Sequence, residues 1–206
     1  MSYRNQFIYQ VFVRNYSQEG TFKAVEKDLG RIQALGADIV YLMPVQPIGV
    51  KARKGTYGSP YAIQNYTGIS EDLGTLADLK DLIDATHKHG MKIILDIVFH
   101  HTARDHHWVV EHPEFYYFDE NGRLKNKVGD WWDIADLNFD VPLVHEKLID
   151  VLLYWLDLGM DGFRFDVPSL IPLDFLLEAK KAMRQKNPEV FLLGESVDSN
   201  YIDYLR

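Results

Sequence analysis

Short apolar runs alternate with amphipathic helical spacings along this chain, and the alternation limits the possible folds more than any other feature. The runs have the length of strands and are rich in β-branched and aromatic residues, whereas the segments between them repeat apolar positions every three or four residues. The predicted strands are residues 7–13, 39–45, 92–99, 162–167 and 190–195, and the predicted helices are residues 21–35, 75–89, 144–158 and 173–186. A β-α unit repeated in this way indicates an α/β fold with a parallel sheet.

Two parallel folds fit such a pattern, an open doubly wound sheet and a barrel. A nucleotide-binding open sheet has a glycine-rich turn after its first strand, but Arg14-Asn15-Tyr16-Ser17 follows here. In a barrel the functional residues lie on the loops after the strands, where this chain concentrates its polar and aromatic residues. We therefore expect a (β/α)8 TIM barrel, of which residues 1–206 supply the N-terminal five β-α units.

Two connections, residues 46–74 and 100–141, are too long for simple turns. Long loops inside a compact domain are usually functional. The second connection follows the third predicted strand and is rich in His, Trp, Tyr and Asp. We expect it to fold as a small inserted lobe over the strand ends, within a single partial barrel domain that covers residues 1–206.

The composition excludes several classes of partner. The net charge is −8 without a cluster of Lys and Arg, which argues against a nucleic acid as partner. No cysteine is present, so a disulfide framework and a thiolate metal site are both excluded. The first residues, 1–6, lack a charged start followed by an apolar signal core, and no apolar stretch has the length of a membrane span. We therefore expect a cytoplasmic protein without a membrane partner.

Two predicted strands end on a carboxylate, Asp166 and Glu195. Neighbouring parallel strands lie about 4.8 Å apart, so these carboxyl groups can approach the roughly 5 Å separation of a retaining glycosidase. Arg164 lies two residues before Asp166 on the same side of the strand, so we expect it to keep Asp166 ionised. Glu195 closes an apolar strand, so we expect desolvation to keep it protonated. Two acids with separated pKa values are what glycoside hydrolysis needs.

Several strand-end motifs together resemble those of the α-amylase family of glycoside hydrolases, family 13. The motifs are Asp96-Ile97-Val98-Phe99-His100-His101, Asp136-Leu137-Asn138, Gly162-Phe163-Arg164-Phe165-Asp166 and Gly194-Glu195, with Gly58-Ser59-Pro60-Tyr61-Ala62-Ile63 before them. The resemblance covers nearly the whole chain. It implies that Asp166 is the nucleophile that forms a covalent glycosyl-enzyme. It also implies that Glu195 is the general acid and then the base for water.

The same resemblance implies residues that bind the substrate. His101 resembles the histidine that hydrogen-bonds the sugar at the cleavage subsite, and Tyr61 resembles the tyrosine on which that sugar stacks. Asp96 resembles the acid that orients this cluster, and Arg164 completes the expected substrate-binding set. The implied substrate is a malto- or isomalto-oligosaccharide with α-1,4 or α-1,6 glucosidic bonds.

The chain also departs from the family pattern. His100 stands where the family usually has an Asn that often binds calcium, which weakens the expectation of a calcium site even though Asp136 can still serve as a ligand. After Asp166, Ser169-Leu170 replaces an amylase-like Lys-His pair, which favours an enzyme for shorter oligosaccharides over a polymer-cleaving amylase. The family's third acid, in an Asn-His-Asp motif, does not occur up to Arg206. We therefore expect a fragment that lacks the C-terminal part of its barrel and is inactive alone.

Two other functions fit parts of the sequence. The first is a catalytically inactive, truncated or carbohydrate-binding remnant, which would explain the lack of the third acid. The second is a metal-dependent barrel hydrolase that uses a histidine group, namely His100, His101, His106 and His107. Adjacent histidines on a strand point to opposite faces, and no carboxylate completes a known ligand spacing. The pair Trp131-Trp132 either packs the small lobe or forms a platform for a sugar.

Overall fold

The computed structural model describes residues 5–195, and its main sheet has five parallel strands in the order β1-β2-β3-β6-β7. The strands are β1 (Ile8–Val11), β2 (Ile39–Leu42), β3 (Lys92–Ile97), β6 (Gly162–Phe165) and β7 (Phe191–Gly194). The predicted α/β fold with five parallel strands is confirmed. Within the described residues β1 and β7 are the edges of the sheet, so this part of the chain forms an open section of a barrel.

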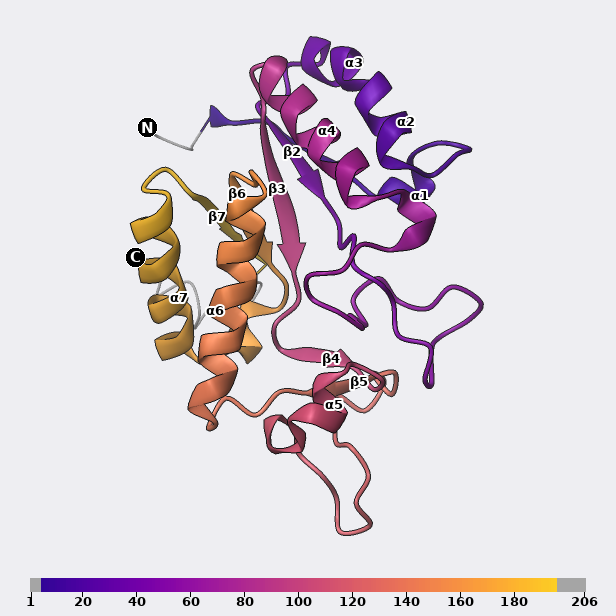
Figure 1. The fold of residues 1–206 in the computed structure, drawn as a ribbon, viewed down its shortest axis with the longest axis vertical. Helices are drawn as coiled ribbons and strands as arrows, with labels where there is room; N and C mark the ends of the chain where they lie inside the picture. Colours follow the sequence, from indigo (N-terminus) through magenta and orange to yellow (C-terminus); the bar gives the residue numbers. More distant parts are fainter. Residues whose placement is uncertain (1–4, 196–206) are drawn as a thin grey trace.

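The helices follow the strands in the expected alternation (Figure 1). They are α1 (Val13–Tyr16), α2 (Phe22–Lys27), α3 (Leu29–Ala34), α4 (Leu76–Lys88), α6 (Pro142–Asp157) and α7 (Leu173–Lys186), with 3-10 turns η2 (Glu71–Leu73) and η4 (Pro168–Leu170). The single helix predicted over residues 21–35 is instead two helices, which meet at Asp28. Asp28 leaves the helical conformation, with φ −102° and ψ 1°, and its carboxylate accepts hydrogen bonds from Tyr16 and Arg31.

The two faces of the main sheet have different neighbours. Val40 and Leu42 of β2 belong to the large core cluster, which also contains buried residues of the helices. Ile39 and Tyr41, which alternate with them, belong to a smaller cluster made only of strand residues. Since successive side chains of a strand point to opposite faces, the helices cover one face of the sheet. The other face of the sheet, which carries the smaller cluster, corresponds to the interior of a barrel.

The close approach of β6 and β7 depends on a glycine. A Cβ atom at Gly162 would lie 1.9 Å from the backbone oxygen of Phe191, its register partner on β7. Such a distance is far inside van der Waals contact, so a side chain at this position would push the two strands apart. Gly162 therefore allows the pairing that brings the ends of β6 and β7 together.

The segment between β3 and α6, residues 100–141, lies beyond the carboxyl end of β3 (Figure 1). We call it the inserted segment. It contains the antiparallel pair β4 (His101–Ala103) and β5 (Ile134–Asp136), helix α5 (Trp108–Glu111) and the 3-10 turn η3 (Pro113–Phe115). Across residues 5–195, no helix has the length and apolar character needed to cross a membrane.

Candidate active site

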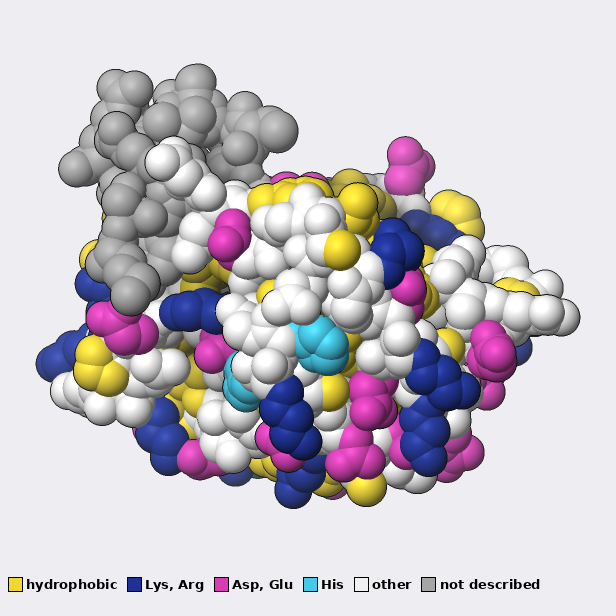
Figure 2. All heavy atoms as spheres, turned by 90° about the horizontal axis from the view of Figure 1, so that it is seen from above, with side chains coloured by type: hydrophobic (Ala, Val, Ile, Leu, Met, Phe, Trp, Pro, Cys, Tyr) yellow, Lys and Arg dark blue, Asp and Glu magenta, His cyan; other side chains and the backbone are white. Residues whose placement is uncertain are grey.

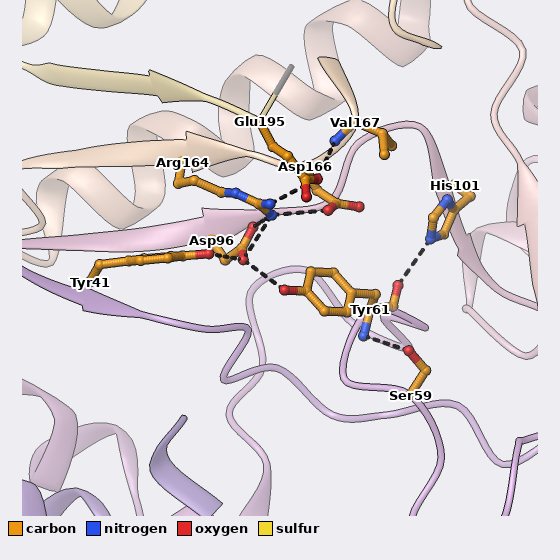
Figure 3. Close-up of polar contacts among 9 residues, drawn as sticks. All are labelled: Tyr41, Ser59, Tyr61, Asp96, His101, Arg164, Asp166, Val167 and Glu195. Carbon is orange, nitrogen blue, oxygen red and sulfur yellow. Dashed lines mark hydrogen bonds and ion pairs between the residues drawn. The ribbon is translucent and has the colours of Figure 1, made fainter. Parts of the chain in front are cut away.

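Arg164 lies at the centre of a cluster of three carboxyl groups (Figure 3). Its Nη1 donates to the two carboxylate oxygens of Asp96 at 3.0 and 3.1 Å and to Oδ1 of Asp166 at 2.9 Å. Its Nη2 lies 2.8 Å from Oε2 of Glu195. Asp166 and Glu195 therefore contact the same guanidinium group, and the expected contact between Arg164 and Asp166 is confirmed.

The strand register explains why these side chains meet. Asp96 on β3 lies opposite Arg164 on β6. Asp166 directly follows β6, and its backbone N–H donates to the carbonyl of Ile97 at 2.9 Å. Glu195 directly follows β7, and its N–H donates to the carbonyl of Phe165 at 3.0 Å. The cluster thus lies at the carboxyl ends of three neighbouring strands, where barrel enzymes carry their chemistry.

The protonation of Asp166 differs from the sequence-based expectation. Burial raises the pKa of Asp166 to about 7, with a further contribution from the charge of Asp96, and Arg164 opposes both. The prediction that Arg164 keeps Asp166 ionised is therefore wrong below about pH 7, because burial and the charge of Asp96 outweigh the one guanidinium that three carboxyl groups share. The Glu195 side chain is 49% exposed at the end of β7, which is an edge strand within the described residues, so its desolvation in the protein that contains this chain stays a prediction.

Asp96 connects the carboxylate cluster to two tyrosines. Its side chain is fully buried, and it accepts hydrogen bonds from the hydroxyl groups of Tyr41 and Tyr61 as well as from Arg164. Burial raises the pKa of Asp96, against the opposing effect of Arg164. The ring of Tyr61 extends toward Asp96 (Figure 3), so this acid fixes both the arginine and the tyrosine.

His101 holds the other end of Tyr61. Its Nε2 lies 3.1 Å from the Tyr61 carbonyl oxygen, which can only accept, so Nε2 carries the proton. Burial lowers the pKa of His101 to about 3, and the ring is neutral near pH 7. Its Nδ1 lies 3.2 Å from Nδ1 of His100, and the two rings meet edge to face. The expectation that these histidines point to opposite faces is wrong, because His100 lies in a bend before β4.

A cavity of about 340 Å³ opens beside this cluster. Asp166, Glu195, Tyr61 and His101 contribute to its lining. The motifs did not indicate four further lining residues, Lys54, Asp133, Ile134 and Val167. Another cavity, of about 400 Å³, lies beside α1 and η2, and its lining contains none of the three carboxyl groups that Arg164 contacts.

Val167 has a strained backbone beside the two acids. Its φ of 36° and ψ of 50° place a β-branched residue in the left-handed region, which costs of order 1–3 kcal/mol. In this conformation its N–H points to Oε2 of Glu195 at 3.5 Å. The strain turns the chain sharply after Asp166, so that both acids face the cavity.

The residues around Asp136 do not fit the expected calcium site. The Asp136 side chain is 1% exposed, and its Oδ2 accepts from the backbone N–H of Lys127 at 2.7 Å. Its Oδ1 has no hydrogen-bond partner and lies 3.7 Å from a ring nitrogen of His100. Calcium takes six to eight oxygen ligands, and this environment offers a nitrogen instead. Within residues 5–195, no group of three or more His, Cys, Asp or Glu residues can hold a metal ion.

Trp131 and Trp132 have separate environments. Trp131 lines the cavity, and its ring centre lies 5.6 Å from that of His101. Trp132 is 53% exposed, and Nζ of Lys54 lies 4.6 Å from the centre of its ring. The two residues therefore do not form one platform, and Trp131 is the one that contributes to the cavity wall.

The surface at the other end of the sheet lacks such a concentration of acids. Figure 2 views the molecule from above, facing the amino end of β3. Basic and acidic side chains are interspersed across this face, with histidine near its centre. Charge of one sign is not gathered there, in contrast to the cluster around Arg164.

The fold and the site together define a section of a (β/α) barrel with a carboxylate cluster at the carboxyl ends of its strands. The family model for the α-amylase catalytic domain matches residues 7–133 and 129–204. The chain therefore belongs to the α-amylase family, as the motifs indicated.

Solved structures and curated proteins agree with this assignment. An α-amylase from Lactobacillus plantarum is 52% identical, with a TM-score of 0.93, over 98% of this chain and 48% of that chain. A noncanonic maltogenic α-amylase from Thermotoga neapolitana is 37% identical, with a TM-score of 0.91, over 98% of this chain and 48% of that chain. An α-1,4-glucan:maltose-1-phosphate maltosyltransferase from Pseudomonas aeruginosa is 33% identical over 91% of this chain and 32% of that protein. The chain thus spans about half of the two structures and a third of the maltosyltransferase.

Proposed function

We propose that the protein containing this chain is a retaining enzyme that cleaves α-1,4 or α-1,6 glucosidic bonds of malto- or isomalto-oligosaccharides. The observation that carries the proposal is the pair Asp166 and Glu195, which contact one guanidinium and line one cavity. The relatives' names support the substrate class, since they include an α-amylase, a maltogenic α-amylase and a transferase named for an α-1,4-glucan and maltose 1-phosphate.

In this reaction the ionised form of Asp166, which is populated at and above its pKa of about 7, attacks the anomeric carbon and forms a covalent glycosyl-enzyme, while Glu195 protonates the departing oxygen. Glu195 then takes a proton from water, which hydrolyses the intermediate. A sugar hydroxyl in place of water would give transfer with the same two acids.

Arg164, Tyr61, His101 and Asp96 are the proposed substrate-binding set. Tyr61 and His101 line the cavity, where a ring face and a neutral imidazole can contact an uncharged sugar. Asp96 and Arg164 lie behind them and fix the positions of Tyr61 and Asp166. This arrangement holds the nucleophile rigidly before substrate arrives, which is the condition for efficient positioning.

The test is hydrolysis of a nitrophenyl α-maltoside by the full-length protein that contains this chain. Asp166→Asn should lower kcat/KM by about 10⁴-fold or more, since the nucleophile is lost. Asp174→Asn, at an exposed acid in the first turn of α7, is the matched control and should leave kcat/KM unchanged. Wild-type turnover by Asp166→Asn would refute the proposal. Retention is checked separately by NMR, which should show the α-anomer of maltose as the first product.

A further inference from the structure

Lys54 and Asp133 form an ion pair in the wall of the cavity that contains Asp166 and Glu195. Nζ of Lys54 lies 3.2 Å from Oδ1 of Asp133. The same ammonium group lies 4.6 Å from the ring centre of Trp132. Lys54 comes from the connection after β2, whereas Asp133 and Trp132 belong to the inserted segment, so the pair joins two loops across the cavity wall.

The pair has unused hydrogen-bonding capacity. An ammonium group has three N–H donors, and the contact with Asp133 takes one of them. The Asp133 side chain is 3% exposed, and its Oδ2 has no hydrogen-bond partner among the described residues. An unpaired buried carboxylate oxygen is costly to a fold. The ammonium of Lys54, which is more exposed than Asp133, keeps donors for a ligand in the cavity, and the oxygen of a sugar hydroxyl accepts such a hydrogen bond.

The charge around the cavity favours an uncharged ligand. The cavity lining contains the ammonium group of Lys54 and three carboxyl groups, those of Asp133, Asp166 and Glu195. Arg164, which is not a lining residue, contacts the last two. The nearest of the three carboxyl groups to Lys54, that of Asp133, already neutralises the ammonium. A phosphate group would meet net negative charge here, and like charges in a shared site repel. The arrangement therefore favours hydroxyl groups over phosphate.

We propose that Lys54, held in place by Asp133, binds hydroxyl groups of an unphosphorylated glucosyl unit in this cavity. Lys54 is a substrate-binding residue, and Asp133 is a positioning residue that acts through it. The identity of the sugar rests on the proposed function above. The preference for an uncharged unit rests on the ion pair and on the carboxyl groups around it.

The first experiment removes the ammonium group in the full-length protein. Lys54→Met keeps most of the side-chain stem, and it should raise the KM for a nitrophenyl α-maltoside about tenfold while kcat changes less than twofold. Lys51→Met is the matched control, because Lys51 is exposed in the same loop and does not line the cavity. Equal KM values for the two variants would overturn the proposal.

The second experiment removes the charge of the Asp133 side chain and keeps its shape. Asp133→Asn leaves the Lys54 ammonium without its counter-charge, so inhibition by maltose 1-phosphate should become about fivefold stronger, while the KM for the nitrophenyl α-maltoside rises. A thermal melt of the variant establishes that it is folded. Unchanged inhibition by maltose 1-phosphate in folded Asp133→Asn would overturn the charge argument.

A direct binding measurement separates this proposal from the proposed function. Turnover by the wild type that is lost in Asp166→Asn establishes the function independently of Lys54. If the wild type shows no turnover, calorimetric titration with maltotriose still shows whether Lys54 contributes to sugar binding. Binding about tenfold weaker in Lys54→Met supports the role of Lys54, whereas equal binding, or no binding by the wild type, overturns it.

Discussion

The strand-end cluster and the inserted segment both bury titratable groups, but they do so in opposite ways. At the strand ends, Arg164 contacts three carboxyl groups, and the pKa of Asp166 is raised to about 7 by burial and neighbouring charge. In the inserted segment, burial lowers the pKa values of His101 and His106 to about 3, so both rings are neutral near pH 7. The first region holds an acid that titrates near neutral pH, whereas the second holds buried histidines that stay neutral there.

Loss of the shared cation should have the largest effect on stability. Arg164→Met leaves the buried carboxyl groups of Asp96 and Asp166 without their partner, and the free energy of unfolding should fall by about 3–5 kcal/mol. Urea denaturation at pH 7 measures this value. Lys186→Met, which removes an exposed ion pair with Asp157, should cost less than about 1 kcal/mol. Equal losses in the two variants would show that the cluster is not a buried charge network.

The pH dependence of stability tests the raised pKa of Asp166. Its folded-state pKa of about 7 exceeds the unfolded value of about 3.9, so between these pH values the folded protein holds a proton that the unfolded chain has released. Stability from this group is therefore present at low pH and lost as the pH rises from about 4 to 7. Asp166→Asn removes the effect and should gain on the order of 4 kcal/mol relative to wild type across this range. If the difference in unfolding free energy between Asp166→Asn and the wild type did not vary with pH, the raised pKa of Asp166 would be contradicted.

The contribution of the inserted segment to stability should depend on pH with the opposite sign. The pKa of His106 is about 3 when folded and about 6.5 when unfolded, so the unfolded state takes up the proton first. Stability from this group is lost as the pH falls below about 6.5, at about 1.4 kcal/mol per pH unit. His106→Asn keeps an acceptor for the backbone N–H of Trp108 and should flatten this slope. His107→Asn, at a neighbour that is 46% exposed, should keep the wild-type slope, and equal slopes in the two variants would refute the assignment.

The sequence predicts the arrangement of strands well because a β-α period is a local pattern. The helix over residues 173–186 is found with the expected bounds, whereas the break at Asp28 depends on its side-chain contacts with Tyr16 and Arg31, which no periodicity reveals. The assignment of residues 1–206 to one domain with an inserted lobe stays a prediction.

The site was predictable to the extent that strand order places motif residues together. Arg164, Asp166 and Glu195 meet because β6 and β7 are neighbours. The protonation of Asp166 was not predictable, since it depends on how deeply the side chain is buried and on how many carboxyl groups share Arg164. The ion pair of Lys54 and Asp133 joins two loops that lie far apart in the sequence, and no motif marks either residue.

The most direct test of the central claim is to trap the proposed covalent intermediate. The full-length protein is incubated with a 5-fluoro maltosyl fluoride, digested, and analysed by peptide mass spectrometry. A glycosyl group attached to Asp166, and absent from Asp166→Asn, is the predicted result. A glycosyl group attached to Glu195 or to another carboxylate would contradict the assignment of Asp166 as the nucleophile.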